Sequence, residues 1–243
     1  LDRRVATPRL YQVLNPHGFL FSGWLLLPLL VWIPPRRPMD NMSLSLLSPA
    51  EEEYAMLNSS RLSPYWGFVF PQQSRHYNRF IYADDWSGPE RERWQQLYRG
   101  FLRRLVLFSR RRPLLKSPYN TARIALLKRV FPNARFIHIR RHPHAVYRSN
   151  MRFAEHGIAV HQLQDADSHS SYLEQLPKHH LRMERIWQRE KESLGPGRMA
   201  ELRFEELERD PVGAIERVYG QLELAFTADL SERIRAYAAS LEG

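Results

Sequence analysis

The sequence predicts an α/β fold of three layers, in which helices cover both faces of a parallel central sheet. Apolar runs at residues 113–115 and 134–139 have the length of buried strands, and they alternate with helical patterns at residues 121–131 and from residue 145 onward. This order of strands and helices is typical of a parallel sheet covered by helices. A third apolar run, residues 199–204, adds a further strand to the predicted sheet.

Length and composition predict a single domain over residues 1–243. The chain is 43 % apolar and 26 % charged, which is ordinary for a globular protein large enough to bury one core. It contains no cysteine, so disulfides and thiolate metal sites are excluded and we expect a cytoplasmic protein. The ten histidines show no close spacing with acidic residues, and no metal site is predicted.

The net charge of +10 indicates an anionic partner. The cations are 32 arginines and only 4 lysines, and arginine binds phosphate and sulfate with two parallel hydrogen bonds. The base composition of the genome is an alternative explanation for most of these arginines.

The most apolar run, residues 19–33, is 15 residues long and contains Pro28. A transmembrane helix needs roughly 20 apolar residues. We therefore predict a helix over residues 20–32 that is either buried or docked on a surface. Peripheral contact with a membrane through residues 19–33 is one interpretation of this run.

Other helices carry clear start signals or apolar spacing. Residues 48–51, Ser-Pro-Ala-Glu, form a capping-box pattern that predicts a helix over residues 49–58. Residues 61–78 are rich in aromatic residues and prolines and are predicted to be irregular. Residues 89–109 have apolar side chains at helical spacing. Further helices are predicted over residues 171–193 and 211–222.

Two polar segments follow the predicted strands at the edge where parallel sheets bind ligands. Residues 116–120, Lys-Ser-Pro-Tyr-Asn, come directly after the first strand. Residues 140–143, Arg-Arg-His-Pro, come after the second strand, and Ser149 lies about two turns into the next helix. Because ligands collect at the carboxyl ends of the strands, where helix N-termini also point, these donors predict a phosphate site. Solvated loop charges are the alternative.

The same segments resemble motifs of the sulfotransferase family. Arg141-His142-Pro143, with Ser149 eight positions after the arginine, is similar to the element that grips the 3'-phosphate of the sulfuryl donor. Residues 131–139 resemble the strand that leads into this element, and residues 116–123 resemble the family's strand-end lysine motif.

Three more segments carry the resemblance. Residues 37–41 and 48–53 are similar to segments of one large, mainly bacterial and plant-like subgroup of sulfotransferases. Residues 202–211 are similar to its last core strand and the following helix start. The similarity runs from about residue 5 to residue 224, and the motifs occur in the right order.

The resemblance implies an enzyme with a sheet related to that of nucleotide kinases. It would move a sulfuryl group from 3'-phosphoadenosine 5'-phosphosulfate (PAPS) to a hydroxyl group of a small-molecule, lipid or carbohydrate acceptor. By position, Arg141 and Ser149 would bind the 3'-phosphate and Phe204 would lie near the adenine. Lys116 would lie near the sulfuryl group or the acceptor. PAPS is then the co-substrate, and no metal is expected.

A base must take the proton of the acceptor hydroxyl, and sulfotransferases use His or Glu for this step. Asn120 stands where some relatives carry His. Among the glutamates at 51–53, Glu51 is explained as the capping-box partner of Ser48, so Glu53 is preferred as the base and Glu52 comes next. The alternative is that none of the three is the base and that all are solvated glutamates at a helix N-terminus. His17 is a further candidate for the base.

The sequence also departs from the family's pattern. Sulfotransferases of this kind begin with a strand and a loop containing Gly and Ser or Thr that cradles the 5'-phosphosulfate, and none of the 11 glycines lies in such a loop. The C-terminal basic loop that often covers the nucleotide also has no counterpart. We interpret the sequence as a fragment or truncated gene product, without the first strand and the phosphosulfate loop, and expect it to be inactive or marginally stable by itself.

Two other functions compete with this interpretation. The net charge would suit a non-enzymatic nucleic-acid-binding protein, but Arg110-Arg111-Arg112 is the only tight basic run and no zinc-finger spacing is present. No nucleic-acid partner is therefore expected. A nucleotide kinase of the same sheet class would need a Gly-Lys-Ser/Thr phosphate loop, which the sequence does not contain.

Overall fold

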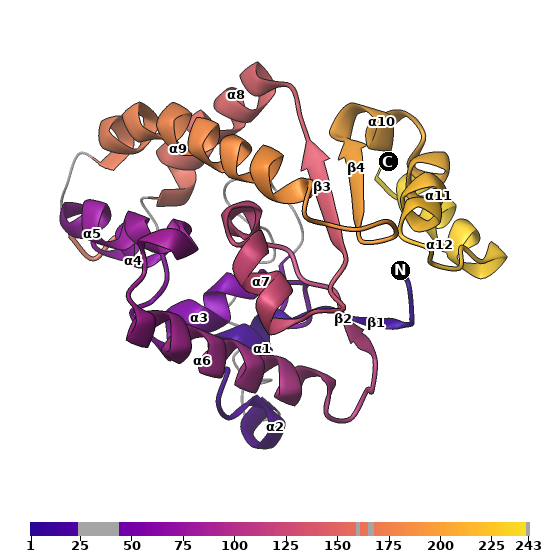
Figure 1. Ribbon diagram of the computed structural model, residues 1–243, viewed down its shortest axis with the longest axis horizontal. Coiled ribbons are helices and arrows are strands. Elements are labelled where there is room, and N and C mark those ends of the chain that lie inside the picture. The colour runs from indigo at the N-terminus through magenta and orange to yellow at the C-terminus, as the bar shows by residue number, and fades with distance from the viewer. Residues whose placement is uncertain (24–43, 159–160, 165–167, 242–243) are drawn as a thin grey trace.

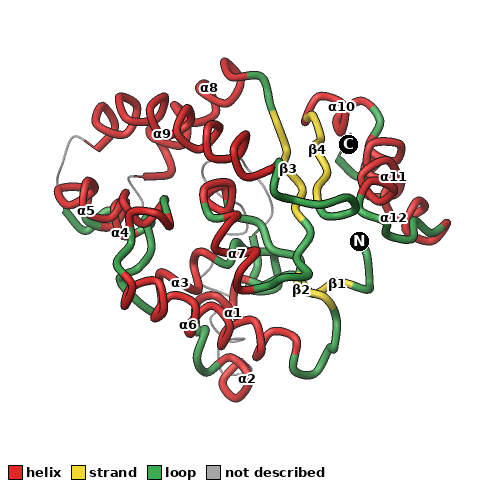
Figure 2. The backbone as a smooth tube through the Cα atoms, viewed as in Figure 1, coloured by secondary structure: helices red, strands yellow, loops and turns green. Residues whose placement is uncertain are grey.

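The computed structural model describes residues 1–23, 44–158, 161–164 and 168–241. Helices make up most of this part of the chain, and its strands form two parallel pairs (Figure 2). β1 (Val5–Ala6) pairs with β2 (Arg112–Pro113), and β3 (Phe136–Arg140) pairs with β4 (Met199–Arg203). The predicted parallel pairing is confirmed, but the described strands lie in two separate sheets rather than in one central sheet.

The helices surround these strands in unequal groups (Figure 1). α1, α2, α3, α6 and α7 gather on the side of β1 and β2, α9 crosses above them, and α10 to α12 lie beside β4. Their bounds are α1 (Leu10–Leu14), α2 (Phe19–Ser22), α3 (Glu53–Ser59), α4 (Trp66–Val69), α5 (Ser74–Asn78), α6 (Gly88–Val106), α7 (Ile124–Val130), α8 (Pro143–Phe153), α9 (Ser168–Lys191), α10 (Phe204–Arg209), α11 (Pro211–Gln221) and α12 (Ala228–Ala239).

The predicted helix at residues 89–109 is confirmed as α6, and local chemistry explains both of its ends. Ser87 caps the helix by accepting the backbone N–H of Glu90, whose carboxylate accepts the N–H of Ser87 in return. Arg110 has a φ of 52°, and its N–H donates to the carbonyl of Val106 at 2.9 Å. α6 itself ends at Val106, and this contact of the left-handed Arg110 closes one further turn over residues 107–110.

The capping box predicted at residues 48–51 is wrong. α3 begins at Glu53, and no side chain caps it. The Ser48 hydroxyl accepts the N–H of Ser45 at 3.0 Å, while the Glu51 carboxylate is bound to side chains distant in the sequence. Residues 61–78, predicted to be irregular, contain α4, α5 and a short 3-10 turn between them.

The largest core lies between α1, α3, α6 and α7, and it holds in place the segments that carry the candidate site. Trp94 and Tyr98 of α6 are buried and stack at 4.3 Å between ring centroids. They pack in one cluster with Met56 of α3 and Leu127 of α7. A smaller cluster joins β4 to α11 through Leu202, Ala214 and Val218, among others. The predicted helices at residues 171–193 and 211–222 are confirmed as α9 and α11.

Two features of the sequence fall mainly outside the described residues. The described residues include only 20–23 of the predicted helix 20–32 and only 19–23 of the membrane-contact run 19–33, and residues 19–22 of this stretch form α2. The family-like segment 37–41 lies outside the described residues. In the part of the chain that is described, no helix combines the length and apolar character needed to cross a membrane.

Candidate active site

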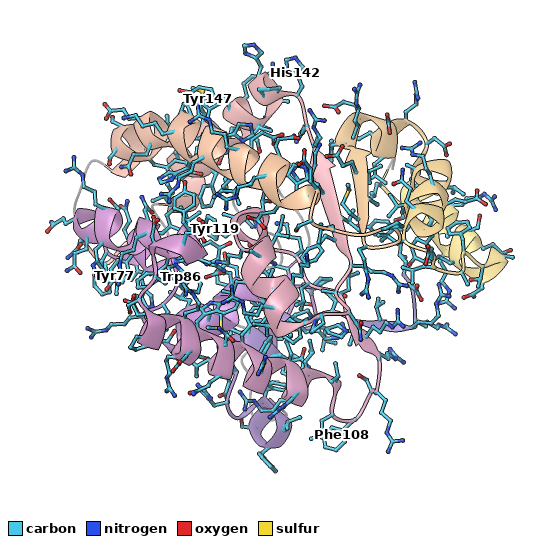
Figure 3. The ribbon with its side chains drawn as sticks, viewed as in Figure 1. Tyr77, Trp86, Phe108, Tyr119, His142 and Tyr147 are labelled. Atoms are coloured by element: carbon cyan, nitrogen blue, oxygen red, sulfur yellow. The ribbon has the colours of Figure 1, made fainter. Side chains whose placement is uncertain are left out.

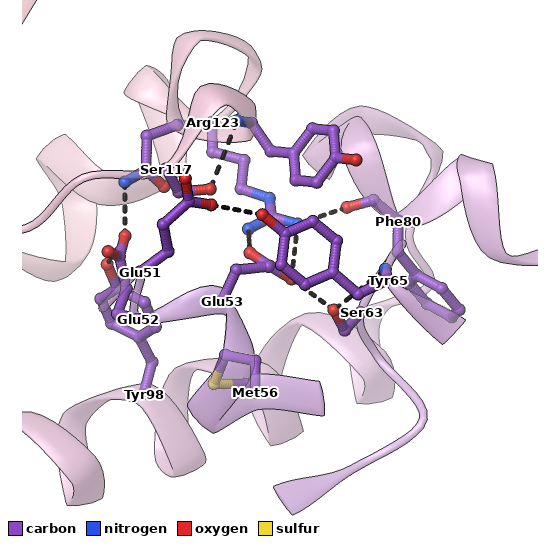
Figure 4. A network of polar contacts seen from close by, with 12 residues as sticks. Glu51, Glu52, Glu53, Met56, Ser63, Tyr65, Phe80, Tyr98, Ser117 and Arg123 are labelled. Atoms are coloured by element: carbon purple, nitrogen blue, oxygen red, sulfur yellow. Dashed lines mark hydrogen bonds and ion pairs between the residues drawn. The ribbon is translucent and has the colours of Figure 1, made fainter. Parts of the chain in front are cut away.

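Residues 51–53 and the segment 116–123 are joined by contacts between their side chains (Figure 4). The two segments are far apart in the sequence. Each of the three consecutive glutamates binds a different group of the lysine-motif segment, and the three carboxylates have different environments. Their different surroundings separate the chemical roles that the glutamates can have.

Glu53 is completely buried and forms an ion pair with Arg123, with 2.5 Å between Oε2 and Nη1. Its other oxygen accepts the Ser63 hydroxyl at 2.7 Å. Arg123 also donates to the carbonyl of Phe80 at 2.7 Å and lies 5.3 Å from the ring centroid of Trp86. Glu53, predicted as the base, has a carboxylate that is enclosed by protein and holds a buried charge in place, an environment that favours a structural role.

Glu52 is also buried, but its main partners are neutral groups. It accepts the backbone N–H of Lys116 at 3.0 Å, the amide of Asn120 at 2.6 Å and the hydroxyl of Tyr98 at 3.1 Å. Burial raises the pKa of Glu52 above its ordinary value of 4.5. Glu52 therefore fixes the backbone at Lys116, and the side-chain amide of Asn120 holds the Glu52 carboxylate in position.

Glu51 is the one glutamate of the three whose side chain reaches solvent, with a relative exposure of 20 %. Its carboxylate contacts the ammonium group of Lys116, whose side chain is 75 % exposed, and the hydroxyl of Tyr65. Burial raises the pKa of Tyr65 well above 10, so this phenol keeps its proton and donates a hydrogen bond to Glu51. Glu51 and Lys116 are thus the acid and the cation of these contacts whose side chains solvent reaches.

A cavity of about 560 Å³ lies between α4, α8, α9 and the carboxyl end of β3. Its wall carries apolar and aromatic side chains together with a few polar groups, and includes Phe68, Tyr119, His138, Ile139, Arg140, Arg141, Val146, Asn150, Ile158, Tyr172, Leu176, His179 and Met183. Tyr119 connects the cavity with the Glu51 contact, since its ring packs against that of Tyr65 at 5.6 Å between centroids. This mixture is typical of a site for a largely apolar ligand with a few polar atoms.

Two histidines in this wall were not predicted as site residues. The Tyr82 hydroxyl and Nδ1 of His179 are hydrogen-bonded at 2.7 Å, and the His138 ring packs on Trp187 at 4.2 Å between centroids. Burial lowers the pKa of both imidazoles below 6.5, so both are neutral at pH 7. Nε2 of His179 and Nδ1 of His138 have no hydrogen-bond partner within the described ranges. No local sequence pattern marks His179, which the length of α9 brings to the cavity.

Arg141 lies at the edge of this cavity and over the ring of Phe204, with 4.3 Å from the guanidinium carbon to the ring centroid. The strand register explains the contact, because Arg140 of β3 is paired with Arg203 of β4 and the next residue of each strand is Arg141 or Phe204. The side chain of Arg141 is exposed. Ser149 is partly buried on α8, the helix that begins two residues after Arg141.

The predicted site residues thus fall into two groups. Arg141 and Phe204 touch each other, and α8 carries Ser149 from the same strand end. Lys116 belongs to the glutamate contacts, and the segment that follows it, residues 118–121, contributes to the wall of the cavity. Among the described residues, no group of three His, Asp or Glu side chains could hold a metal ion.

Comparison with known proteins agrees with the sequence motifs. Residues 37–228 match the model of the sulfotransferase family. The omega-hydroxy-beta-dihydromenaquinone-9 sulfotransferases Stf3 of Mycobacterium bovis and Mycobacterium tuberculosis are 31 % identical over 239 residues, which is 98 % of this chain and 61 % of theirs. The chain therefore spans about three fifths of the length of these relatives.

A solved structure shows the same fold. The crystal structure of sulfotransferase STF9 from Mycobacterium avium matches with a TM-score of 0.72 and 20 % identity, covering 98 % of this chain and 62 % of that chain.

Proposed function

Because the chain belongs to the sulfotransferase family, we propose that it takes part in the transfer of a sulfuryl group from PAPS to a hydroxyl group. The observation that supports this most directly is the contact of Arg141 with Phe204 beside the cavity that also borders the lysine motif. In such an enzyme the donor site and the acceptor site must adjoin. Arg141, which we assign to the donor site, lies in the wall of the same cavity as residues of the lysine-motif segment. Membership of the family decides against a nucleotide kinase and against a nucleic-acid-binding protein.

The residues at the ends of β3 and β4 fit the nucleotide part of PAPS. The Arg141 guanidinium forms no salt bridge with a carboxylate in the described part of the chain, so its donors are available to a phosphate. The Phe204 ring offers a flat apolar face of the kind on which an adenine stacks. Within this proposal, Arg141 and Ser149 bind the 3'-phosphate and Phe204 lies against the base.

The cavity suits an acceptor with a long apolar part. The name of the Stf3 relatives describes action on an omega-hydroxy-dihydromenaquinone, which is a lipid. Apolar side chains from α8, α9 and the segment before α8 line the cavity here, and the neutral His179 offers a ring nitrogen without a partner in the described residues. Among small-molecule, lipid and carbohydrate acceptors, a lipid alcohol is the class that this wall favours.

Glu51 and Lys116 are assigned the chemistry at the acceptor hydroxyl. As the acceptor oxygen bonds to sulfur, its proton moves to the Glu51 carboxylate and the bond from sulfur to the 5'-phosphate oxygen breaks. Lys116 neutralises the charge that develops on that oxygen, and adenosine 3',5'-bisphosphate leaves. Glu51 takes the role that the sequence assigned to Glu53, because it is the accessible carboxylate beside the lysine.

The fold of a solved sulfotransferase matches this chain with a TM-score of 0.72. We therefore assign the two strand pairs, which are not hydrogen-bonded to each other in the described residues, to one parallel sheet of the nucleotide-kinase type.

Nucleotide binding tests the proposal. Thermal shifts of the purified chain are compared in adenosine 3',5'-bisphosphate, ATP and duplex DNA at equal concentrations. The bisphosphate should stabilise the protein most, since only it carries the 3'-phosphate that Arg141 would bind. A larger shift in ATP or in DNA would overturn the assignment of the donor site.

A further inference from the structure

The turn that follows α6 exposes two apolar side chains among arginines. Leu107 is 55 % exposed and Phe108 is 81 % exposed, whereas the apolar residues of the preceding helical turns are buried or partly buried. Residues 103–112, here called the arginine tip, also carry exposed side chains at Arg103, Arg110, Arg111 and Arg112. Contiguous exposed apolar side chains rimmed by polar residues mark interaction surfaces, and Leu107 and Phe108 are such a pair among these arginines.

The positive charge of the arginine tip is not neutralised locally. The sequence contains no Asp or Glu between Arg93 and Lys116. Within the described residues, none of the four exposed arginines of the tip forms a salt bridge. Arg104, which points back to the body of the protein, donates instead to the carbonyl of Pro16 at 2.9 Å. The tip therefore presents charge that an anionic surface could satisfy.

The backbone of the tip keeps a side chain where glycine would be favoured. Arg110 adopts a φ of 52°, a left-handed conformation that glycine reaches at lower cost. Its N–H closes the helix on the Val106 carbonyl at 2.9 Å. Arginine at this position completes a run of three consecutive arginines, residues 110–112, but it costs the conformational energy of a left-handed backbone.

A second exposed aromatic residue lies at the same end of the molecule. Phe21 of α2 is 82 % exposed. α2 is attached to α6 through the contact of Phe19 with Phe101, at 6.1 Å between ring centroids, and through the Arg104 bond to Pro16. In the view of Figure 3, Phe108 and α2 both lie at the lower edge of the molecule. The apolar character of the surface thus extends beyond the tip itself.

We infer that the arginine tip docks on the surface of an anionic phospholipid membrane. Phe108 and Leu107 enter the headgroup region, where aromatic and apolar side chains are stabilised, and the arginines bind lipid phosphates. A nucleic acid would use the same arginines but would leave Phe108 and Leu107 in water, so the apolar pair favours lipid. This inference does not depend on the proposed sulfuryl transfer.

Vesicle co-sedimentation of the purified chain tests the inference. The probes are vesicles of phosphatidylcholine alone and vesicles in which one third of the lipid is phosphatidylglycerol. Binding is expected to the anionic vesicles only. The triple variant Arg110→Ser, Arg111→Ser, Arg112→Ser should weaken it by about tenfold or more, since each arginine near an anionic surface contributes on the order of a fivefold change in affinity.

Two further variants separate charge from apolar contact. Arg185→Ser, Arg209→Ser, Arg235→Ser removes the same number of exposed arginines from α9, α10 and α12, and should weaken binding by less than about threefold. Phe108→Ser should leave only binding that high salt abolishes, because the apolar part is removed. Thermal melting of each variant checks that these exposed substitutions leave the fold intact.

Equal binding to both kinds of vesicle would overturn the inference, and so would equal losses of binding in the two triple variants. It would also be overturned if duplex DNA at an equal charge concentration displaced the chain from anionic vesicles while Phe108→Ser left vesicle binding unchanged.

Discussion

Glu53 and Arg123 form an ion pair in which neither side chain has more than 1 % of its surface exposed, with 2.5 Å between Oε2 and Nη1. The pair joins the start of α3 to the segment that follows Lys116. Removing one partner from a buried ion pair leaves an uncompensated charge in a medium that solvates it poorly. The contact therefore predicts a structural role for Glu53.

Glu53→Gln should lower the free energy of unfolding by about 3 kcal/mol or more, since Arg123 would stay buried without a counter-charge. Urea unfolding followed by circular dichroism measures the loss. Glu92→Gln on α6 is the matched control, because this glutamate is exposed, and it should change stability by less than about 0.5 kcal/mol. Equal midpoints for the wild type and Glu53→Gln would show that the pair does not stabilise the fold.

Glu51→Gln should instead affect turnover. If Glu51 takes the acceptor proton, kcat should fall by about 10²–10⁴ while the affinity for adenosine 3',5'-bisphosphate stays nearly unchanged. The measurement is sulfation of a lipid alcohol from radiolabelled PAPS, in any form of the protein that shows this activity. Near-normal turnover in Glu51→Gln would remove Glu51 from the mechanism and return attention to Glu52 and His17.

The roles of the three glutamates show what local sequence patterns can and cannot predict. The helix predicted to begin at residue 211 was confirmed, and Asp210 caps it by accepting the N–H of Gly213, three residues away. The capping role predicted for Glu51 failed because its partners, Tyr65 and Lys116, are far away in the sequence. A local pattern carries no information on such contacts, which depend on how segments distant in the sequence pack together.

Arg141 and Phe204 were named from the resemblance to the family, whereas no resemblance pointed to His179 in the cavity wall. The contact between Arg141 and Phe204 follows from the parallel pairing of β3 with β4, because each of them comes directly after the end of its strand. His179 has no comparable signal, because it is one of several polar residues on a long helix. Only the path of α9 past Tyr82 shows that this histidine lies in a cavity wall.

Acid should weaken the cap of α6 through Glu90. Hydrogen bonds from the Arg79 guanidinium hold the pKa of this carboxyl at about 2, against an ordinary value of 4.5. Because the folded-state pKa is lowered, the stabilisation is fully present above pH 4.5 and is lost as the pH falls toward 2. Glu90→Gln should therefore cost about 1 kcal/mol at pH 7 and much less at pH 2.5, as measured by urea unfolding. A difference that is the same at both pH values would mean that the charge of Glu90 contributes nothing.

Arg141 lies at the end of the proposed site that would bind the nucleotide. Arg141→Ala should weaken the binding of adenosine 3',5'-bisphosphate by about 2–4 kcal/mol, the usual loss for a charge-assisted contact with an anion. Adenosine 5'-phosphosulfate lacks the 3'-phosphate, so its affinity should change far less. Arg152→Ala, an exposed arginine later on α8, is the matched control for the change in overall charge.

Isothermal titration calorimetry with the two nucleotides distinguishes the outcomes. A selective loss for the bisphosphate would assign the 3'-phosphate to Arg141. Equal losses for both nucleotides, or an equal effect of Arg152→Ala, would show that Arg141 contributes only general positive charge. Phe204→Leu adds an independent check, because it removes the ring under the guanidinium. Weaker binding of both nucleotides in that variant is expected, since both share the adenine that the ring would stack against.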